Sequence, residues 1–182
     1  MKELLKEMII SNIKEWDDED IYAISLFVYD MNDNPCRPTV TLGYNTESNF
    51  RSEIPYSYDE QEARWNYAGW LQNEFFCFGE GETEQEVIRW LTDNQLPNYA
   101  DDDPIWNNDA MYDEMETVTK KFVEELISIV KEIHQTCLLT EKYGKEIPII
   151  IHELEYYDEI AEQNIEANGL DGLEDFIEFC RG

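Results

Sequence analysis

The sequence has few basic residues, and this scarcity excludes several classes of partner. Its 182 residues include 13 lysines and arginines against 42 aspartates and glutamates, for a formal net charge of −29. A field of this sign repels nucleic acid and anionic membranes, and it accelerates encounters with basic surfaces. We therefore expect a basic protein as partner, and neither nucleic acid nor a membrane.

The sequence also lacks a long apolar run and a secretory signal. The first segment, MKELLKEMIISNIKEW, carries Glu3 and Glu7 among its apolar residues, which is typical of an amphipathic helix of the mature protein. The four cysteines lie far apart without paired spacing, and we expect them to be reduced thiols in a cytoplasmic protein. They are Cys36, Cys77, Cys137 and Cys180.

Common motifs of phosphate, nucleophile and metal chemistry are missing. No GxxxxGK[ST], GxGxxG or GxSxG pattern occurs, which excludes the usual phosphate loops and the nucleophile elbow. Zinc needs three or four nitrogen or sulfur ligands, whereas His134 and Cys137 offer two, on a helix where the apolar stripe already uses Cys137 for packing. We predict no metal and no other cofactor.

What is present suits a folded domain. Apolar residues make up 42% of the chain and aromatic residues 13%, so hydrophobic burial can offset the conformational entropy lost on folding. A chain of this length is typical of one domain. We therefore expect a single α+β domain over residues 1–182.

Periodicity predicts the elements. Apolar residues at helical spacing predict helices over 2–16, 59–72, 83–96, 110–142, 156–168 and 173–180. Runs rich in β-branched and aromatic residues predict strands over 21–30, 39–44 and 147–151. Thr83 and Glu86 form a capping-box pattern, and Gly144 and Gly169 stand where helices should end.

This order of elements predicts the fold class. We expect a small, mainly antiparallel sheet covered by several helices, with residues 110–142 as one long central helix. A three-layer α/β arrangement is the alternative. Residues 120–145 hold four acids and five lysines, so the acidity belongs to the elements around this central helix.

Acidic runs and loop aromatics predict a surface for the basic partner. Aromatic anchors concentrate interface energy, and carboxylates around them select basic groups. The alternative is that the acids are merely solvated and the rings belong to the core. The candidate residues are Asp17, Asp18, Glu19, Asp20, Tyr99, Asp101, Asp102, Asp103 and Trp106.

A second candidate site follows the last predicted strand. His152, Glu153 and Glu155 come at its carboxyl end, where ligands often bind, and a histidine beside carboxylates could act as a general base. This pattern predicts a possible ligand cleft. The alternative is a histidine that is hydrogen-bonded at the edge of the core.

Two segments carry a resemblance to a known family. The stretch IPIIIHELEYYDEIAEQNIEANG, residues 147–169, together with the strand IYAISLFVYD, resembles an uncharacterised family of acidic bacterial proteins. Its members are similar to, or encoded among, immunity proteins of polymorphic and contact-dependent toxin systems. The resemblance implies a bacterial cytoplasmic protein that acts as an inhibitor, and it assigns no active-site residues.

Three hypotheses of function follow. The first is a non-enzymatic acidic protein that binds and inhibits a basic toxin domain, such as a nuclease. The second is an enzyme or small-ligand protein with a cleft near His152. The third is a DNA mimic with carboxylates that imitate the spacing of phosphates. The charge favours the first hypothesis.

Overall fold

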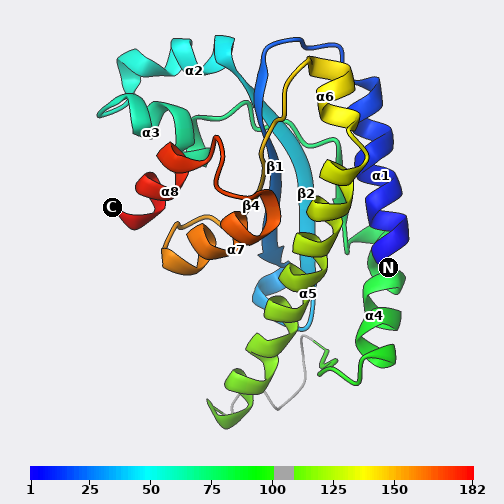
Figure 1. Cartoon of the computed structure of the whole chain (residues 1–182). Helices are drawn as coiled ribbons and strands as arrows, with labels where there is room; N and C mark the ends of the chain where they lie inside the picture. The colour runs from blue at the N-terminus through cyan, green and yellow to red at the C-terminus, as the bar shows by residue number, and fades with distance from the viewer. Residues whose placement is uncertain (101–108) are drawn as a thin grey trace.

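The computed structural model describes residues 1–100 and 109–182, which fold around a four-stranded sheet of order β3-β2-β1-β4 (Figure 1). Strand β1 (Ile21–Asp30) pairs antiparallel with β2 (Pro38–Thr46), which pairs antiparallel with β3 (Phe76–Phe78). Strand β4 (Ile149–His152) lies parallel to β1 on its other side. The predicted α+β class with a mainly antiparallel sheet is confirmed.

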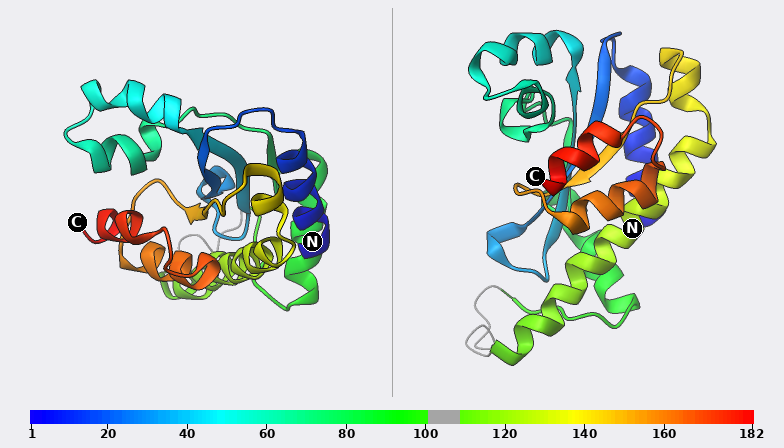
Figure 2. Two further views of the ribbon diagram at one scale, coloured as in Figure 1. Left: turned by 45° about the horizontal axis from the view of Figure 1, so that its top comes forward. Right: turned by 60° about the vertical axis from the view of Figure 1, so that its left-hand side comes forward.

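Helices cover both faces of this sheet (Figures 1 and 2). In Figure 1, α1 and α4 lie to the right of the strands, α2, α3 and α8 lie to the left, and α5 and α7 cross in front. The helices are α1 (Lys2–Glu15), α2 (Glu47–Glu53), α3 (Glu60–Trp65), α4 (Glu84–Asp93), α5 (Asp109–Gln135), α6 (Leu138–Tyr143), α7 (Asp158–Asn168) and α8 (Glu174–Arg181). Within the described residues, no helix is both long and apolar enough to cross a bilayer.

Side chains of β1 point to alternate faces of the sheet and enter two different hydrophobic clusters. Leu26 and Val28 point into the larger cluster, which α1, α4 and α5 complete, whereas Ala23 belongs to the smaller cluster beneath α3, α7 and α8. A register irregularity between Ile21 and Ala23 lets Tyr22 join the smaller cluster while Ile21 stays in the larger one. The sheet is therefore buried on both faces at this end of β1.

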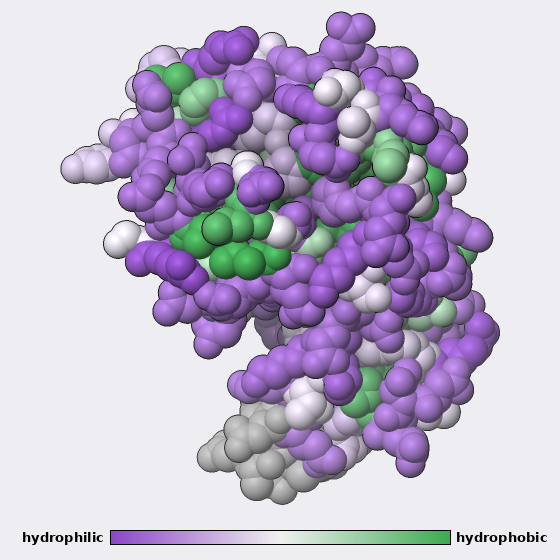
Figure 3. Space-filling model, viewed as in Figure 1, coloured by the Kyte–Doolittle hydropathy of each residue, from purple (hydrophilic) through white to green (hydrophobic). Residues whose placement is uncertain are grey.

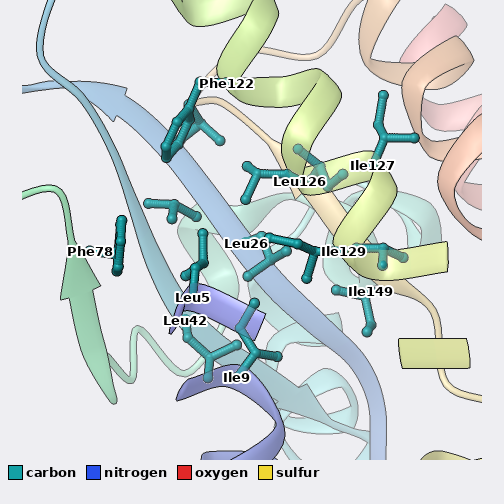
Figure 4. Close-up of a cluster of buried hydrophobic side chains, with 14 of the residues drawn as sticks. Leu5, Ile9, Leu26, Leu42, Phe78, Phe122, Leu126, Ile127, Ile129 and Ile149 are labelled. Carbon is teal, nitrogen blue, oxygen red and sulfur yellow. The ribbon is translucent and has the colours of Figure 1, made fainter. Parts of the chain in front are cut away.

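The long helix α5 supplies one wall of the larger cluster, as the sequence predicts. Phe122, Leu126 and Ile129 are fully buried and point toward Leu26 and Leu42 of the sheet (Figure 4). Burying each such side chain stabilises the fold by about 1.5–3 kcal/mol. The prediction of one long central helix is confirmed.

The predicted helix over 110–142 is nevertheless broken in two. Cys137 adopts the left-handed conformation (φ 58°, ψ 13°) between α5 and α6, and its N–H donates to the carbonyl of His134 at 3.2 Å. Its side chain is exposed, so the prediction that Cys137 packs in the apolar stripe is wrong. Gly144, at φ 72°, ends α6 as predicted.

Two further predictions fail for local reasons. The helix expected over 59–72 ends at Trp65, because Asn66 is extended and its side chain accepts the N–H of Ala68 to start a separate turn. Helix α4 begins at the expected place, but Thr83 does not cap it. Its hydroxyl instead accepts the N–H of Gly79 at 2.9 Å and donates to the carbonyl of Glu80 at 3.0 Å.

Two asparagines of α7 close the outer edge of β4. Asn164 accepts the N–H of Ile151 at 2.8 Å and donates to its carbonyl at 2.7 Å, and Asn168 does the same for Ile149 at 2.8 and 3.0 Å. The four residues from Asn164 to Asn168 rise about 6 Å along the helix axis, and two strand residues span about 6.6 Å. The asparagine pair therefore matches the strand and takes the place of a fifth strand.

This arrangement predicts that Asn164→Ala is strongly destabilising. The variant leaves the buried N–H of Ile151 without its partner, and such a group costs about 1–3 kcal/mol. Gln163→Ala is the matched control, because the carbonyl of Ile151 accepts from both Gln163 and Asn164 and keeps one donor. Urea denaturation should show the larger loss in the free energy of unfolding for Asn164→Ala; an equal loss in both variants would contradict this role.

The left-handed break between α5 and α6 predicts opposite effects for two substitutions of Cys137. The left-handed conformation costs a residue with a Cβ about 1–2 kcal/mol, and glycine avoids this cost. Glycine also loses more conformational entropy on folding, so Cys137→Gly should raise the free energy of unfolding by roughly 0.5–1 kcal/mol in total. Cys137→Val should lower it, because β-branched residues tolerate this region least. Thermal and urea unfolding measure the order, and a valine variant as stable as the glycine variant would refute it.

Candidate functional site

Two cavities lie at opposite ends of β1. The first, of about 430 Å³, is formed before β1 by the turn Trp16–Glu19 together with Lys142 and Tyr143 of α6. The second, of about 640 Å³, lies at the carboxyl end of β1, between α5 and α7. The first cavity contains residues predicted to bind the partner, and the second contains Glu153 of the predicted ligand cleft.

The acidic turn before β1 is held by two of its own carboxylates. Asp18 accepts a hydrogen bond from the hydroxyl of Tyr44, and Asp20 accepts from the backbone N–H and the hydroxyl of Ser48 at 2.8 and 2.5 Å. The hydroxyl of Ser48 holds the pKa of Asp20 below its usual value. Asp17 and Glu19 are exposed, which leaves them open to a partner.

Aromatic rings form the floor beside this turn. Trp16 is buried, with its ring centroid 4.7 Å from that of Tyr44 and 5.1 Å from that of Phe75. Burial and the charge of Asp18 raise the pKa of Tyr143 to about 12. The indole nitrogen of Trp16 and the hydroxyl of Tyr143 have no hydrogen-bond partner among the described residues. Acidic side chains and aromatic rings therefore lie next to one another at this turn.

Tyr99, a further candidate for partner binding, does not join this turn. Tyr99 is half-buried against the larger cluster, and its carbonyl accepts from Asn34 in the loop after β1. The ten residues of β1, at about 3.3 Å per residue, separate that loop from Asp20 by roughly 30 Å. Asp101, Asp102, Asp103 and Trp106 lie outside the described residues.

His152 is enclosed by the smaller cluster. Its side chain has no exposed surface, and its ring centroid lies 4.6 Å from that of Tyr67 and 5.5 Å from that of Phe27. Nδ1 lies 3.0 Å from the carbonyl of Glu153, which can only accept, so Nδ1 carries the proton and Nε2 accepts from the hydroxyl of Ser25 at 2.8 Å. Burial lowers the pKa of His152 to about 4. The ring is neutral at physiological pH.

Ser25 and His152 are residue types that form a nucleophile and its activating base in many enzymes, but a substrate cannot reach them here. Ser25 is 2% exposed and His152 is fully buried, whereas a nucleophile must meet its substrate directly. Both hydrogen bonds of the ring go to fixed partners of the fold. The geometry suits a core histidine that joins β4 to β1.

Glu153 and Glu155 are accessible to solvent, whereas His152 is fully buried. Glu155 is exposed, whereas Glu153 is half-buried and lines the second cavity. Asp30, at the end of the parallel strand β1, lines the same cavity. Figure 3 shows a hydrophilic hollow in the molecule beneath α7, on the side of the amino-terminal half of α5. A cavity therefore lies next to Glu153, and neither His152 nor Glu155 is among its lining residues.

Sequence reasoning misses most residues of this second cavity. Parallel pairing of β1 with β4 brings Asp30 and Glu153 to one edge of the sheet, and a correct prediction of that pairing would have joined them. Thr119 of α5 donates to Asp30 at 3.2 Å and Tyr157 donates to Glu153 at 3.1 Å. The contact of Thr119 with Asp30 joins residues that are 89 positions apart, so it leaves no local pattern in the sequence. Among the described residues, no group of three or more histidines, cysteines and carboxylates is arranged to hold a metal ion.

No model of a protein family, no curated protein and no solved structure matches this chain. The resemblance to toxin immunity proteins therefore stays a prediction.

The environment of Asp30 predicts a pH-dependent effect of Asp30→Asn. Burial, followed by the charges of Glu153 and Asp33, raises the pKa of Asp30 to about 6, while its hydrogen bond from Thr119 acts in the opposite direction. The folded chain therefore holds the proton more tightly than the unfolded chain, and ionisation between about pH 4 and pH 6 destabilises the fold. Asparagine cannot ionise.

The free energy of unfolding of Asp30→Asn, minus that of the wild type, should increase by about 1–2 kcal/mol as the pH rises from 4 to 6. This range allows for the partial exposure of Asp30. Above pH 6 the difference should stay constant. Urea titrations at pH 4, 5, 6 and 7 measure this difference. Asp93→Asn, at an exposed position, is the control and should show little change. A difference for Asp30→Asn that is the same at every pH would refute the raised pKa.

Proposed function

We propose that this chain is a non-enzymatic acidic binding protein that neutralises a basic partner in the bacterial cytoplasm. The expected partner is a toxin domain, such as a nuclease with a basic cleft. The observation that carries the proposal is the net charge of −29. Such a charge steers a basic partner toward the chain and speeds their association.

Internal pairing of the few basic side chains supports this proposal. Lys2 and Lys6 both bind Glu132, at 2.5 and 2.7 Å, and Arg64 binds Glu47 at 2.7 Å. Most of the other lysines and arginines also have carboxylate partners within the chain. Because acids outnumber bases threefold, many exposed carboxylates keep no counter-charge of their own. A basic partner would supply it.

The acidic turn before β1 is the best-formed part of that surface. Asp17 and Glu19 are exposed beside the cavity that contains Trp16 and Tyr143, and Phe75 is 39% exposed nearby, in contact with Trp16. Exposed carboxylates over aromatic rings can hold a lysine or arginine by charge and by contact with the ring faces. The turn is also rigid, because Asp18 and Asp20 are hydrogen-bonded to Tyr44 and Ser48.

The enclosure of His152 supports binding over catalysis. A general base must reach the proton that it removes, but this ring lies in the core with both nitrogens engaged. An enzyme would need other residues. The binding hypothesis needs only the surface charge and a rigid scaffold.

The test begins with the partner itself. The tagged chain is purified from its native host, the bound protein is identified and expressed alone, and survival is measured with and without this chain. The proposal expects a basic protein that is toxic by itself and harmless when this chain is co-expressed. A partner that is acidic, or toxicity that is unchanged by this chain, would refute it.

Association kinetics then test the acidic turn. The association rate of the purified pair should fall by about tenfold or more between 20 and 500 mM NaCl, because salt screens steering. Asp17→Asn with Glu19→Gln should weaken binding by roughly tenfold. Glu82→Gln with Asp93→Asn removes the same charge from other exposed positions and is the control. A rate that is flat with salt, or equal weakening by both double variants, would exclude this turn as the interface.

A further inference from the structure

The cavity at the carboxyl end of β1 is a second, independent feature. Its volume of about 640 Å³ falls within the roughly 300–1,000 Å³ that is typical of small-ligand sites. It lies outside the ends of the parallel strands β1 and β4, which is a frequent place for ligands in sheets with parallel strands. It also lies at the opposite end of the sheet from the acidic turn.

Carboxylates from four parts of the chain line this cavity. Asp30 ends β1, Glu153 follows β4, and Glu116 and Glu159 come from α5 and α7. Lys120 is the basic residue of the lining, and its ammonium is 3.8 Å from the carboxylate of Glu116. The lining therefore keeps an excess of negative charge after this pair is counted.

Apolar side chains complete the walls. Pro35 comes from the loop after β1, Val123 from the face of α5, and Tyr157 from the residue before α7. The hydroxyl of Tyr157 donates to Glu153 at 3.1 Å, which fixes the ring and the carboxylate relative to each other. A ligand here would meet both an apolar surface and carboxylate oxygens.

We propose that this cavity binds an organic cation, namely an ammonium or guanidinium group on a short apolar chain. The carboxylates exclude anions by repulsion, and an apolar neutral molecule would leave half-buried charges without a partner. An organic cation satisfies both parts of the lining. This inference goes beyond the proposed function and does not depend on it.

Asp30 explains why a cation would be held rather than merely attracted. It is half-buried and receives a hydrogen bond from Thr119 at 3.2 Å. Burial raises its pKa to about 6, so its charged form lacks sufficient stabilisation in the free protein. A bound ammonium or guanidinium would provide the missing charge-assisted hydrogen bonds, each worth more than a neutral one.

The same cation could be a small free molecule or the side chain of a lysine or arginine in another protein. Four probes separate these sources: n-butylguanidinium, its neutral analogue n-butylurea, the peptide acetyl-Gly-Arg-Gly-amide, and the same peptide with citrulline in place of arginine. Each is titrated into the full chain at constant ionic strength. Backbone amide shifts in two-dimensional NMR report where it binds.

We expect n-butylguanidinium to give saturable shifts confined to the cavity, at Val123, Glu153 and Tyr157, and n-butylurea to give none. Asp30→Asn with Glu153→Gln should weaken binding by about tenfold or more, because two charge-assisted contacts are lost. Glu82→Gln with Asp93→Asn should change it less than about twofold, because the same charge is lost elsewhere. Val123→Phe fills the cavity without a change of charge and should also abolish the shifts.

Each outcome decides the proposal. If the arginine peptide binds as tightly as n-butylguanidinium while the citrulline peptide does not, the cavity accepts a protein side chain; if only n-butylguanidinium binds, it accepts a small free organic cation. Shifts that spread over the acidic surface without saturating would overturn the site. Equal weakening by both double variants, or full binding by a folded Val123→Phe protein, would overturn it as well.

Discussion

The position of β4 depends on the hydrogen bonds that it receives from both sides. On one side it pairs in parallel with β1, and on the other the amides of Asn164 and Asn168 bind the backbone of Ile151 and Ile149. Buried backbone groups are nearly always paired, so a strand with one neighbour needs such a substitute. These two side chains fix α7 against the sheet, and α7 in turn carries one wall of the larger cavity.

A second constraint is the separation of charge from the core. The buried face of α5 contains Phe122, Leu126 and Ile129, while the carboxylates lie on the outer elements or at the two ends of the sheet. A net charge of −29 opposes compaction by self-repulsion. The two hydrophobic clusters on opposite faces of the sheet counteract that repulsion. Both acidic cavities therefore rest on a scaffold that burial, rather than ion pairing, stabilises.

The sequence predicts the elements that have a clear period. The bounds of β1, α1 and α7 agree within two residues with their apolar patterns, and the glycine after α7 ends that helix as expected. Local side-chain chemistry overrides the pattern elsewhere. Asn66 starts a turn where a helix is predicted, and Cys137 adopts a left-handed conformation within an unbroken apolar stripe. Neither conformation is encoded in periodicity.

The two candidate sites also differ in how much of each the sequence predicts. The acidic turn is visible in the sequence because its carboxylates are consecutive, and the structure adds Trp16 and Tyr143 from distant elements. Of the residues predicted for a cleft, His152, Glu153 and Glu155, only Glu153 lines the larger cavity. Asp30 reaches it through parallel pairing of β1 with β4, which requires contacts across 120 residues or more. The histidine neighbour of Glu153 was a misleading signal, because His152 is the last, fully buried residue of β4, whereas Glu153 follows the strand and is half-buried at the cavity.

The closed edge of β4 limits how this chain can meet another protein. A common mode of recognition adds a strand to an open sheet edge through backbone hydrogen bonds. Here the asparagines of α7 already occupy that edge at Ile149 and Ile151, and the opposite edge is the three-residue strand β3. Recognition then depends on side chains, which makes it selective for charge and shape. The same closure disfavours edge-to-edge pairing between copies of the chain.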